Sequence, residues 1–350
     1  MKVVLLNDQL NAGGAERVLV NMANQLHKNG VEVKVVLFLK PSILDALIDP
    51  DIPVSYLHRK GRFDLRAMFA LKKEVRTFDI VHVHSRYNLR YYFVSKILTG
   101  IKKPKIVFHE HIPILKVDYF TRFCLKKSNA YLAVLKSMCL WAEKTLHLPS
   151  SHIFYLPNIV CAPIGNINQQ LSGCKIMMTG NIWHFKNQLF AVDLINELPE
   201  SYTLDIYGRI NDKNYYQKMI AKIEKDKLQH RIKIIQSVNN IYEVTGKYNF
   251  AIHTSPDETG PLVLIEYMYA GLPFLAYKTG DVIENVIDEL PEVVMNSFDI
   301  ENWKNSISHV MNNDKCRSHI RQKMKAIVAQ KFSEDKYFQQ LNHIYQSILN

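Results

Sequence analysis

Hydrophobic residues occur along the chain in short runs, separated by longer segments in which apolar and polar residues alternate with a helical period. The short runs predict buried β-strands, and the segments between them predict amphipathic helices. In the first part of the chain, strands are expected at 3–6, 31–38, 80–84, 105–109, 130–133 and 153–155. The main helices between them are expected at 15–28, 65–77, 89–98 and 137–146.

This alternation is interrupted after residue 155. Pro157 and Asn158 begin a loose polar stretch that runs to Gly173, and we expect the domain linker there. The alternation then resumes, with strands expected at 175–179, 202–207, 232–235, 250–253, 273–277 and 293–295. The helices expected with them are 187–197, 214–225, 241–247, 263–270, 303–312, one that ends near 330, and 334–349.

The order of these elements predicts an α/β protein with two doubly wound, Rossmann-like domains, at 1–160 and 161–333. A length of 350 residues also favours two hydrophobic cores over one. Ligands of such sheets bind beyond the carboxyl ends of the strands, so two facing sheets predict a site in the cleft between the domains. The last helix is amphipathic, with apolar residues at helical spacing: Tyr337, Leu341, Ile344, Tyr345 and Ile348.

Positive charge is concentrated in the first domain. Residues 1–160 contain 24 Lys and Arg against 12 Asp and Glu, whereas residues 161–350 contain 20 against 21. The net charges of +12 and −1 account for the +11 of the whole chain. This basic half is expected to meet an anionic partner, either a lipid surface, a lipid-linked phosphate or a nucleic acid, unless it is only a solvated basic surface.

Other features of composition favour a cytoplasmic protein. The five cysteines are scattered without metal-ligand spacing, as expected for reduced thiols. The first apolar run is too short for a signal peptide, and no stretch of about eighteen apolar residues predicts a membrane span.

The segment 255–273 carries the most specific chemistry. It follows a predicted strand and runs into a predicted helix, with Pro261 suited to the first helical turn and Gly271 to the C-terminal stop. The backbone N–H groups of Thr259, Gly260, Leu262 and Val263 lie at the positive end of the helix dipole. Such a helix start binds anions, and a glycine lets a phosphate approach closely.

Two carboxylates flank this helix start. Glu258 precedes the helix and Glu266 lies eight residues on, at most about 12 Å along the axis at 1.5 Å per residue. A pyrophosphate between them would place a sugar at one end and a ribose at the other. The alternative makes Glu258 a helix-start acid and Glu266 a surface residue, but Glu266 lies in an apolar run where a solvated acid is less expected.

With Gly260-Pro261-Leu262 between the two acids, this segment resembles the E-x7-E signature of the retaining glycosyltransferases of family 4, which have the GT-B fold. The resemblance implies that Glu258 lies beside the donor sugar and that Glu266 binds the ribose hydroxyls. It also implies that the amides between them hold the pyrophosphate or the sugar hydroxyls. In this family the C-terminal helix, here 334–350, crosses back onto the first domain.

The loop 179–187 resembles a second family motif, in which an Arg and a Lys bind the diphosphate. Lys186 matches the lysine, but Asn181 stands where the family has the arginine. Either Arg209, in the turn after the next strand, supplies the missing cation, or binding relies more on Lys186 and the helix amides. A solvated lysine that opens a helix is the alternative for Lys186, although the helix dipole disfavours a cation there.

Two further matches lie in the first domain. The turn with Gly13 and Gly14 resembles the glycine loop by which the family approaches the donor phosphates and the acceptor. It lacks the G-x-G-x-x-G pattern of nicotinamide binding. His109 aligns with a family histidine near the transferred sugar, or it is only a strand-terminal residue. His109-Glu110-His111 lacks the H-E-x-x-H spacing, so a zinc site is not expected.

Three segments of the first domain mix cations with aromatic residues: 59–73, 86–93 and 119–127. Such segments suit the interface of an anionic membrane, although ordinary amphipathic helices have the same composition. With the net charge of this half, they lead us to expect a peripheral enzyme at the inner face of the cytoplasmic membrane.

The combined expectation is a retaining glycosyltransferase that moves a hexose-type sugar from a nucleoside-diphosphate sugar, with UDP favoured. The acceptor is expected to be lipid-linked or a saccharide in surface polysaccharide synthesis. On the family resemblance no cofactor or metal is expected, and no Asp-x-Asp pair lies beside a strand end to suggest a metal. The alternatives are a nucleotide-sugar epimerase of the same fold and a non-catalytic basic module for membrane or nucleic acid. The nucleic-acid partner is disfavoured, because no motif for it is visible.

Overall fold

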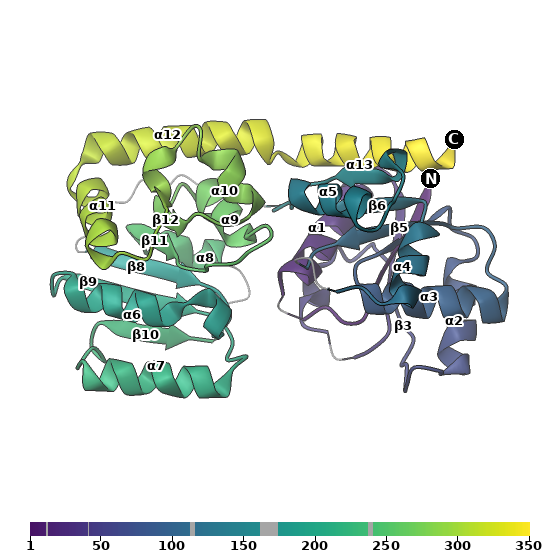
Figure 1. Ribbon diagram of the computed structural model, residues 1–350, viewed down its shortest axis with the longest axis horizontal. Coiled ribbons are helices and arrows are strands. Elements are labelled where there is room, and N and C mark those ends of the chain that lie inside the picture. Colours follow the sequence, from purple (N-terminus) through teal and green to yellow (C-terminus); the bar gives the residue numbers. More distant parts are fainter. Residues whose placement is uncertain (12, 41, 113–115, 162–173, 237–240) are drawn as a thin grey trace. The chain divides into compact units, whose positions relative to one another are not determined.

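The computed structural model describes residues 1–11, 13–40, 42–112, 116–161, 174–236 and 241–350 (Figure 1). It divides into two compact units, the first formed by Met1–Cys161 with Ser333–Asn350 and the second by Ala162–Phe332. Most of the predicted linker, 162–173, lies outside the described residues. In the described part of the chain, no helix combines the length and apolar character needed to cross a bilayer. All five cysteines are free thiols.

The first unit is built on a seven-stranded parallel sheet, with strand order β3-β2-β1-β4-β5-β6-β7. Its strands are β1 (Lys2–Asn7), β2 (Glu32–Leu37), β3 (Val54–Tyr56), β4 (Ile80–Val83), β5 (Lys105–Glu110), β6 (Ala130–Ala133) and β7 (Ile153–Tyr155). The order reverses between β1 and β4, which creates the crevice where doubly wound sheets bind ligands.

Helices cover both faces of this sheet, so the central strands are apolar on both sides. Val4 and Leu6 of β1 pack into one core, whereas Val3 and Leu5 pack into the other. The helices are α1 (Gly14–Lys28), α2 (Leu65–Val75), α3 (Arg86–Thr99), α4 (Tyr119–Lys126), α5 (Lys136–Lys144) and α13 (Glu334–Leu349). The buried side of α13 joins the same core as α1, through Tyr337, Leu341, Ile344 and Tyr345. The last helix therefore belongs to the first unit, as the resemblance implied.

The second unit repeats the arrangement with a six-stranded parallel sheet in the order β10-β9-β8-β11-β12-β13. Its strands are β8 (Cys174–Thr179), β9 (Tyr202–Tyr207), β10 (Ile232–Ile235), β11 (Phe250–His253), β12 (Phe274–Tyr277) and β13 (Val294–Met295). Here the order reverses between β8 and β11.

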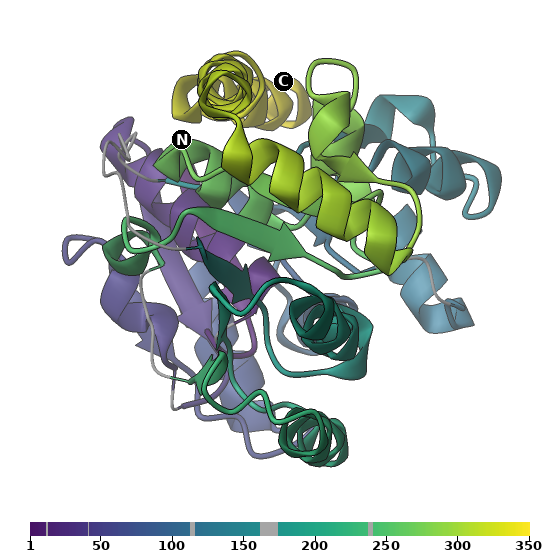
Figure 2. The same ribbon diagram turned by 90° about the vertical axis from the view of Figure 1, so that its left-hand side faces the viewer.

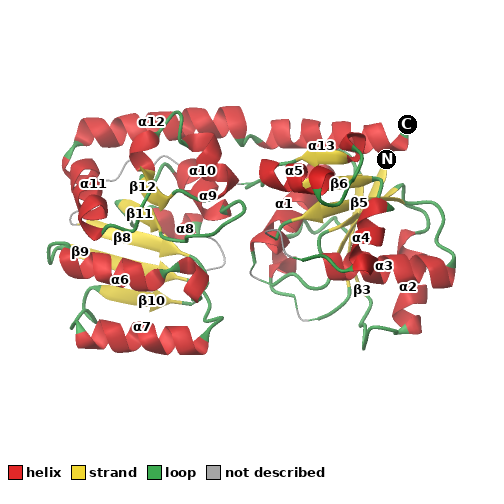
Figure 3. Ribbon diagram, viewed as in Figure 1, coloured by secondary structure: helices red, strands yellow, loops and turns green. Residues whose placement is uncertain are grey.

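Seven α-helices belong to the described part of the second unit, and they flank its strands (Figure 3). They are α6 (Gln188–Glu197), α7 (Lys213–Lys225), α8 (Tyr242–Thr245), α9 (Leu262–Ala270), α10 (Gly280–Val286), α11 (Ile300–Asn312) and α12 (Asp314–Lys331). Figure 2 shows α6 and α7 end-on, lying side by side. Phe190 of α6 packs on Trp303 of α11 with ring centroids 5.3 Å apart.

The predicted fold class of two Rossmann-like α/β domains is confirmed, and most predicted elements are found within a few residues of their expected bounds. Three predicted helices extended too far: 65–77 ends at Val75, 137–146 ends at Lys144, and 241–247 shortens to Tyr242–Thr245. The expected sets omitted the edge strand β3 and the helices α4 and α10. Four short 3-10 helices were also not predicted: Leu44–Leu47, Ser150–His152, His184–Lys186 and Pro291–Val293.

Candidate functional site

The most specific predicted residues of the second unit lie where its strand order reverses. The segment that follows β8 carries Asn181 and Lys186, and the loop that follows β11 carries Glu258 to Pro261 and runs into α9 at Leu262. β8 and β11 are paired and parallel, so both loops leave the same edge of the sheet. Topology therefore brings together two segments that are about 70 residues apart in sequence.

Lys186 ends the 3-10 helix at His184–Lys186, and hydroxyl groups after β11 hold this turn in place. The Thr254 hydroxyl donates to the carbonyl oxygens of Lys186 and Asn187, at 2.9 and 3.1 Å. The Ser255 hydroxyl donates to the carbonyl oxygen of Phe185 at 2.7 Å. Thr254 and Ser255 are both buried, so their hydrogen bonds hold the backbone of the turn that carries Lys186 in place.

Glu258 forms an ion pair with Lys186, and His253 Nε2 lies 3.4 Å from Glu258 Oε1. Burial alone would raise the pKa of the Glu258 carboxyl. The adjacent His253 ring and the Lys186 ammonium group outweigh burial and lower this pKa to about 2. The site thus favours an ionised carboxylate beside a cation.

The start of α9 packs closely against the loop after β12. The Glu258 N–H donates to Thr279 Oγ1 at 2.9 Å, and the Asp281 N–H donates to the Thr259 carbonyl oxygen at 2.9 Å. Gly280 has φ +76°, and a Cβ there would lie 2.9 Å from Pro261 Cδ. A glycine is therefore needed between these loops.

The ends of α9 agree with the predicted helix, with one shift. Pro261 is the N-cap residue, in extended conformation, and the first helical residue is Leu262. Proline was expected one position later, inside the first turn. Gly271 ends the helix in the left-handed conformation at φ 70°, as predicted. Glu266 lies on this helix and is only 8% exposed, so it is not the surface residue of the alternative interpretation.

Hydrogen bonds from the loop after β8 hold the backbone of Arg209, one of them to the Asn181 side chain. The Arg209 N–H donates to Asn181 Oδ1 at 3.3 Å, and the Ile182 N–H donates to the Arg209 carbonyl oxygen at 2.7 Å. The Asn181 side chain therefore holds the backbone of the turn after β9 that carries Arg209. Compensation by Arg209 for the missing family arginine stays a prediction.

The remaining predicted residues belong to the first unit. Gly13 is the N-cap of α1, and Gly14 is the first residue of that helix, at the strand-order reversal after β1. A Cβ on Gly14 would meet nothing within 4 Å, whereas one on Gly13 would meet the Glu16 carboxylate. Open space beside Gly14 leaves the helix start accessible.

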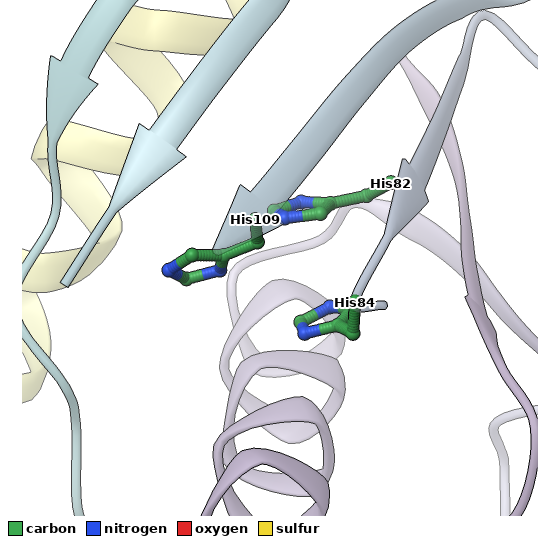
Figure 4. A group of neighbouring side chains, drawn as sticks. All are labelled: His82, His84 and His109. Atoms are coloured by element: carbon green, nitrogen blue, oxygen red, sulfur yellow. The ribbon is translucent and has the colours of Figure 1, made fainter. Parts of the chain in front are cut away.

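His109 is part of a group of buried histidines rather than a single strand-end residue. His82 of β4, His84 after it and His109 of β5 lie together (Figure 4). His111 extends the group, with Nε2 3.0 Å from His84 Nδ1. Residues two apart on a strand share a face, so two His-x-His segments on paired strands place all four rings together. Both ring nitrogens of His109 lack a hydrogen-bond partner among the described residues.

The geometry of this group does not favour a metal ion. Nitrogen atoms of His82, His84 and His109 lie within 4.8 Å of one another. However, the rings of His82 and His84 are stacked at 13°, and those of His84 and His111 at 11°. The lone pairs of the ring nitrogens lie in the ring planes. In stacked rings they therefore lie in separate, nearly parallel planes and do not point at one common atom. A zinc ion instead needs nitrogens that converge at about 2.0–2.1 Å.

Burial keeps these histidines neutral, and this predicts a loss of stability in acid. Burial, assisted by neighbouring histidines, lowers the pKa of His82 to about 3, and burial does the same for His111. The unfolded chain has pKa values near 6.5 and takes up protons first. The stability contributed by neutral histidines is therefore complete above about pH 6.5 and is lost as pH falls toward 3, by about 1.4 kcal/mol per pH unit for each histidine.

Urea unfolding of the first unit between pH 7.5 and 4.5 measures this slope. The slope reports how many more protons the unfolded chain binds than the folded protein. His111→Gln should lower this number by about one, whereas His230→Gln, at an exposed side chain, should leave it unchanged. Equal slopes in all three proteins would show that the buried group does not titrate on unfolding.

The C-terminal helix contacts this group through Tyr345. The Tyr345 hydroxyl lies 2.6 Å from His82 Nδ1, and both side chains are buried. Tyr345→Phe is expected to destabilise the first unit by about 1–3 kcal/mol, because the ring nitrogen is left without a partner. Tyr337→Phe is the control, because its buried hydroxyl has no partner among the described residues. Similar melting points for the two variants would contradict a structural role of this hydrogen bond.

Comparison with known proteins identifies the class of protein. Two family models match the chain, Glycosyltransferase Family 4 over residues 12–161 and Glycosyl transferases group 1 over residues 172–326. Together they span most of both units, so the protein is a glycosyltransferase. The chain belongs to the family 4, group 1 glycosyltransferases, which confirms the resemblance drawn from its motifs.

Solved structures with the same GT-B fold match along the whole chain. Anabaena Alr3699/HepE, in complex with UDP and glucose, matches with 18% identity and a TM-score of 0.81, covering 99% of this chain and 100% of that one. A Rickettsia africae glycosyltransferase matches with 16% identity and a TM-score of 0.80, over 100% and 98%. The lipopolysaccharide outer core galactosyltransferase WaaB matches with 14% identity and a TM-score of 0.72, over 99% of both chains. Curated protein sequences give no significant match.

Sequence reasoning missed several residues that shape the site. His253 contacts Glu258, Thr254 and Ser255 hold the Lys186 turn, and Thr279 receives the Glu258 N–H. The available signal for the first three was a run of polar residues that begins at the last residue of the buried strand β11. Thr279 gave no such signal, because its partner lies 21 residues away.

Proposed function

We propose that the protein transfers a hexose-type sugar, with retention of configuration, from a nucleoside-diphosphate sugar to a lipid-linked or saccharide acceptor in surface polysaccharide synthesis. The observation that carries this proposal is the ionised Glu258 paired with Lys186 beside the start of α9, at the strand-order reversal. A cation and a helix start suit a diphosphate, and a carboxylate suits sugar hydroxyls. UDP is the favoured nucleotide, since the similar Anabaena protein binds UDP and glucose.

In this proposal, each residue has one role. Lys186 and Arg209, with the backbone of Thr259, Gly260 and Leu262, bind the diphosphate and stabilise the charge that forms as it leaves. Glu266 binds the ribose, and Pro261 sets the loop. Glu258 orients the sugar. His109 is assigned to the sugar, and Gly13 and Gly14 to the approach of the donor, on the family resemblance.

The proposed reaction proceeds on one face of the sugar and without a metal ion. The bond from the anomeric carbon to the diphosphate breaks while the acceptor hydroxyl oxygen attacks from the same side. The hydroxyl proton leaves with the diphosphate. Double displacement would need a second carboxylate close to the anomeric carbon. The only carboxylate that we assign to the sugar, Glu258, is already paired with Lys186.

Two measurements test the proposed donor. A panel of UDP- and GDP-sugars should raise the melting temperature, because a ligand that binds only the folded state stabilises it. Glu258→Gln should keep this shift for free UDP and lose most of the transfer rate. A full transfer rate in Glu258→Gln would remove this residue from the mechanism.

An epimerase of the same fold is the second candidate. It would isomerise the nucleotide sugar or release free sugar without an acceptor. Incubation with donor alone separates the two activities, because a transferase consumes donor at a comparable rate only when the acceptor is present.

We also propose that the enzyme works at the cytoplasmic face of the membrane. Exposed apolar side chains gather on α2, α4 and the preceding loops of each: Phe63 72%, Leu65 54%, Phe69 53%, Tyr119 92% and Phe123 46%. Cations are interleaved with them in the sequence, and such mixtures bind anionic lipid surfaces. Flotation with anionic vesicles should exceed flotation with neutral ones, and equal flotation would count against this location.

A further inference from the structure

A small pocket in the first unit is not used by the donor chemistry. It lies between the loop before α2, helix α3 and helix α4, with a volume of about 240 Å³. Arg62 and Phe63 line it from the loop, Tyr87 and Arg90 from α3, and Phe120 from α4. This volume is below the roughly 300–1,000 Å³ of pockets for drug-sized ligands, so it suits a head group rather than an oligosaccharide.

A buried arginine fixes the walls of this pocket. The Arg59 guanidinium lies over the rings of Phe38, Tyr87 and Tyr91, at 4.5, 4.6 and 4.9 Å. Its Nη2 is 2.5 Å from Asp8 Oδ1, so its charge is already paired. The two tyrosines therefore stand in fixed positions before any ligand arrives, which reduces the entropy lost on binding.

The residues that line the pocket contribute positive charge and no acidic side chain. Arg62 and Arg90 are its charged lining residues, and none of the lining residues is acidic. The ion pair of Arg90 with Asp118 is 3.2 Å long and exposed, so it is weak and can be exchanged for a ligand. Two guanidinium groups are suited to a phosphate, which they bind with paired hydrogen bonds.

Apolar surface continues outward from these charges. Phe63 is 72% exposed and Phe120 is 40% exposed, although both line the pocket. A second hollow, of about 730 Å³, shares Phe63 and includes Leu57 and Leu65. Exposed apolar surface of this kind marks a site of binding. A sugar acceptor alone would use neither the paired arginines nor this extended apolar surface.

We propose that this pocket binds the phosphate of a lipid-linked acceptor, with Arg62 and Arg90 on the phosphate and Phe63 and Phe120 on the first apolar units of the chain. This inference rests on the proposed function, because it gives the acceptor its chemical class. The N-terminal ends of α3 and α4 follow β4 and β5, so the pocket lies toward the edge of the sheet where β5 ends, one residue after His109. The acceptor is thus held at the edge where doubly wound sheets bind ligands.

The test uses the full chain and a short, soluble probe, geranyl phosphate, below its critical micelle concentration. Calorimetric titration should show saturable binding of geranyl phosphate, and at least about tenfold weaker binding of geraniol and of inorganic phosphate. Arg62→Gln with Arg90→Gln should weaken geranyl phosphate binding about tenfold or more. Lys102→Gln with Lys127→Gln removes the same charge at exposed positions outside the pocket, and should change nothing.

Equal affinity for geraniol, or for inorganic phosphate, would overturn the proposal, as would unchanged binding in the double arginine variant. Phe63→Ala should weaken geranyl phosphate but not inorganic phosphate, which separates the apolar contact from the charge. UDP-induced thermal shifts are recorded for every variant. Geranyl phosphate binding without any nucleotide shift in the unmodified protein would refute the proposed donor and leave the pocket assignment standing.

Discussion

Lys186→Ala is expected to lower the rate of sugar transfer by about 10²–10³-fold, the usual cost of removing one group that stabilises a developing negative charge. Lys186 is the cation that the structure places beside Glu258, and its turn is held by Thr254 and Ser255. Its loss has a second consequence. Without the Lys186 ammonium group, only His253 opposes the effect of burial, which disfavours the charged form of Glu258. The pKa of this carboxyl should therefore rise from about 2.

Steady-state transfer assays at saturating donor measure the first effect. Lys218→Ala is the matched control, since this lysine is exposed on α7 and should leave the rate unchanged. Lys186→Arg should recover part of the activity because it restores the charge. A rate within threefold of the unmodified enzyme in Lys186→Ala would show that helix amides and Arg209 suffice for the leaving group.

The sequence predicts those residues of this site that lie close together along the chain. Glu258 and Glu266 are fixed relative to each other by one loop and one helix, so their pattern is visible in a single segment. The contact of Lys186 with Glu258 spans 72 residues, and only the pairing of β8 with β11 creates it. A resemblance to family motifs predicted both residues, but not that they form an ion pair.

The histidine group illustrates the same limit. His109 was predicted from its match to a family histidine at the end of a predicted strand. His82 of the neighbouring strand β4, and His84 directly after it, carried no separate signal. Edge strand β3 was missed because its three residues alternate weakly and lie beside Pro53. Helix α10 starts at Gly280, where a Cβ would lie too close to a loop about 20 residues earlier in the sequence. The histidine group and α10 thus depend on tertiary contacts that local pattern does not contain, whereas the local pattern of β3 is too weak to predict a strand.

Gly208→Ala should damage both stability and donor binding, because two backbone segments approach too closely for a side chain. A Cβ on Gly208 would lie 2.1 Å from the carbonyl oxygen of Gly180 and 3.0 Å from Asn181 Cα. These are backbone atoms, so no side-chain rotation relieves the clash. The strands are also tied there, since the Gly180 N–H donates to the Tyr207 carbonyl oxygen at 2.8 Å.

We expect Gly208→Ala to lower the free energy of unfolding of the second unit by about 3 kcal/mol, the upper end of the cost of overpacking. Its melting temperature should fall by about 6–12 °C. Separating the two loops also moves Asn181 away from Arg209, so the concentration of UDP needed for half-maximal thermal shift should rise. Gly246→Ala is the matched control, because a Cβ there meets nothing within 4 Å and its φ is −62°. Equal melting temperatures for the two variants would mean that the loops can separate without a loss of stability. Arg209 would then have no fixed position from which to replace the family arginine, whose place is taken by Asn181 in this sequence.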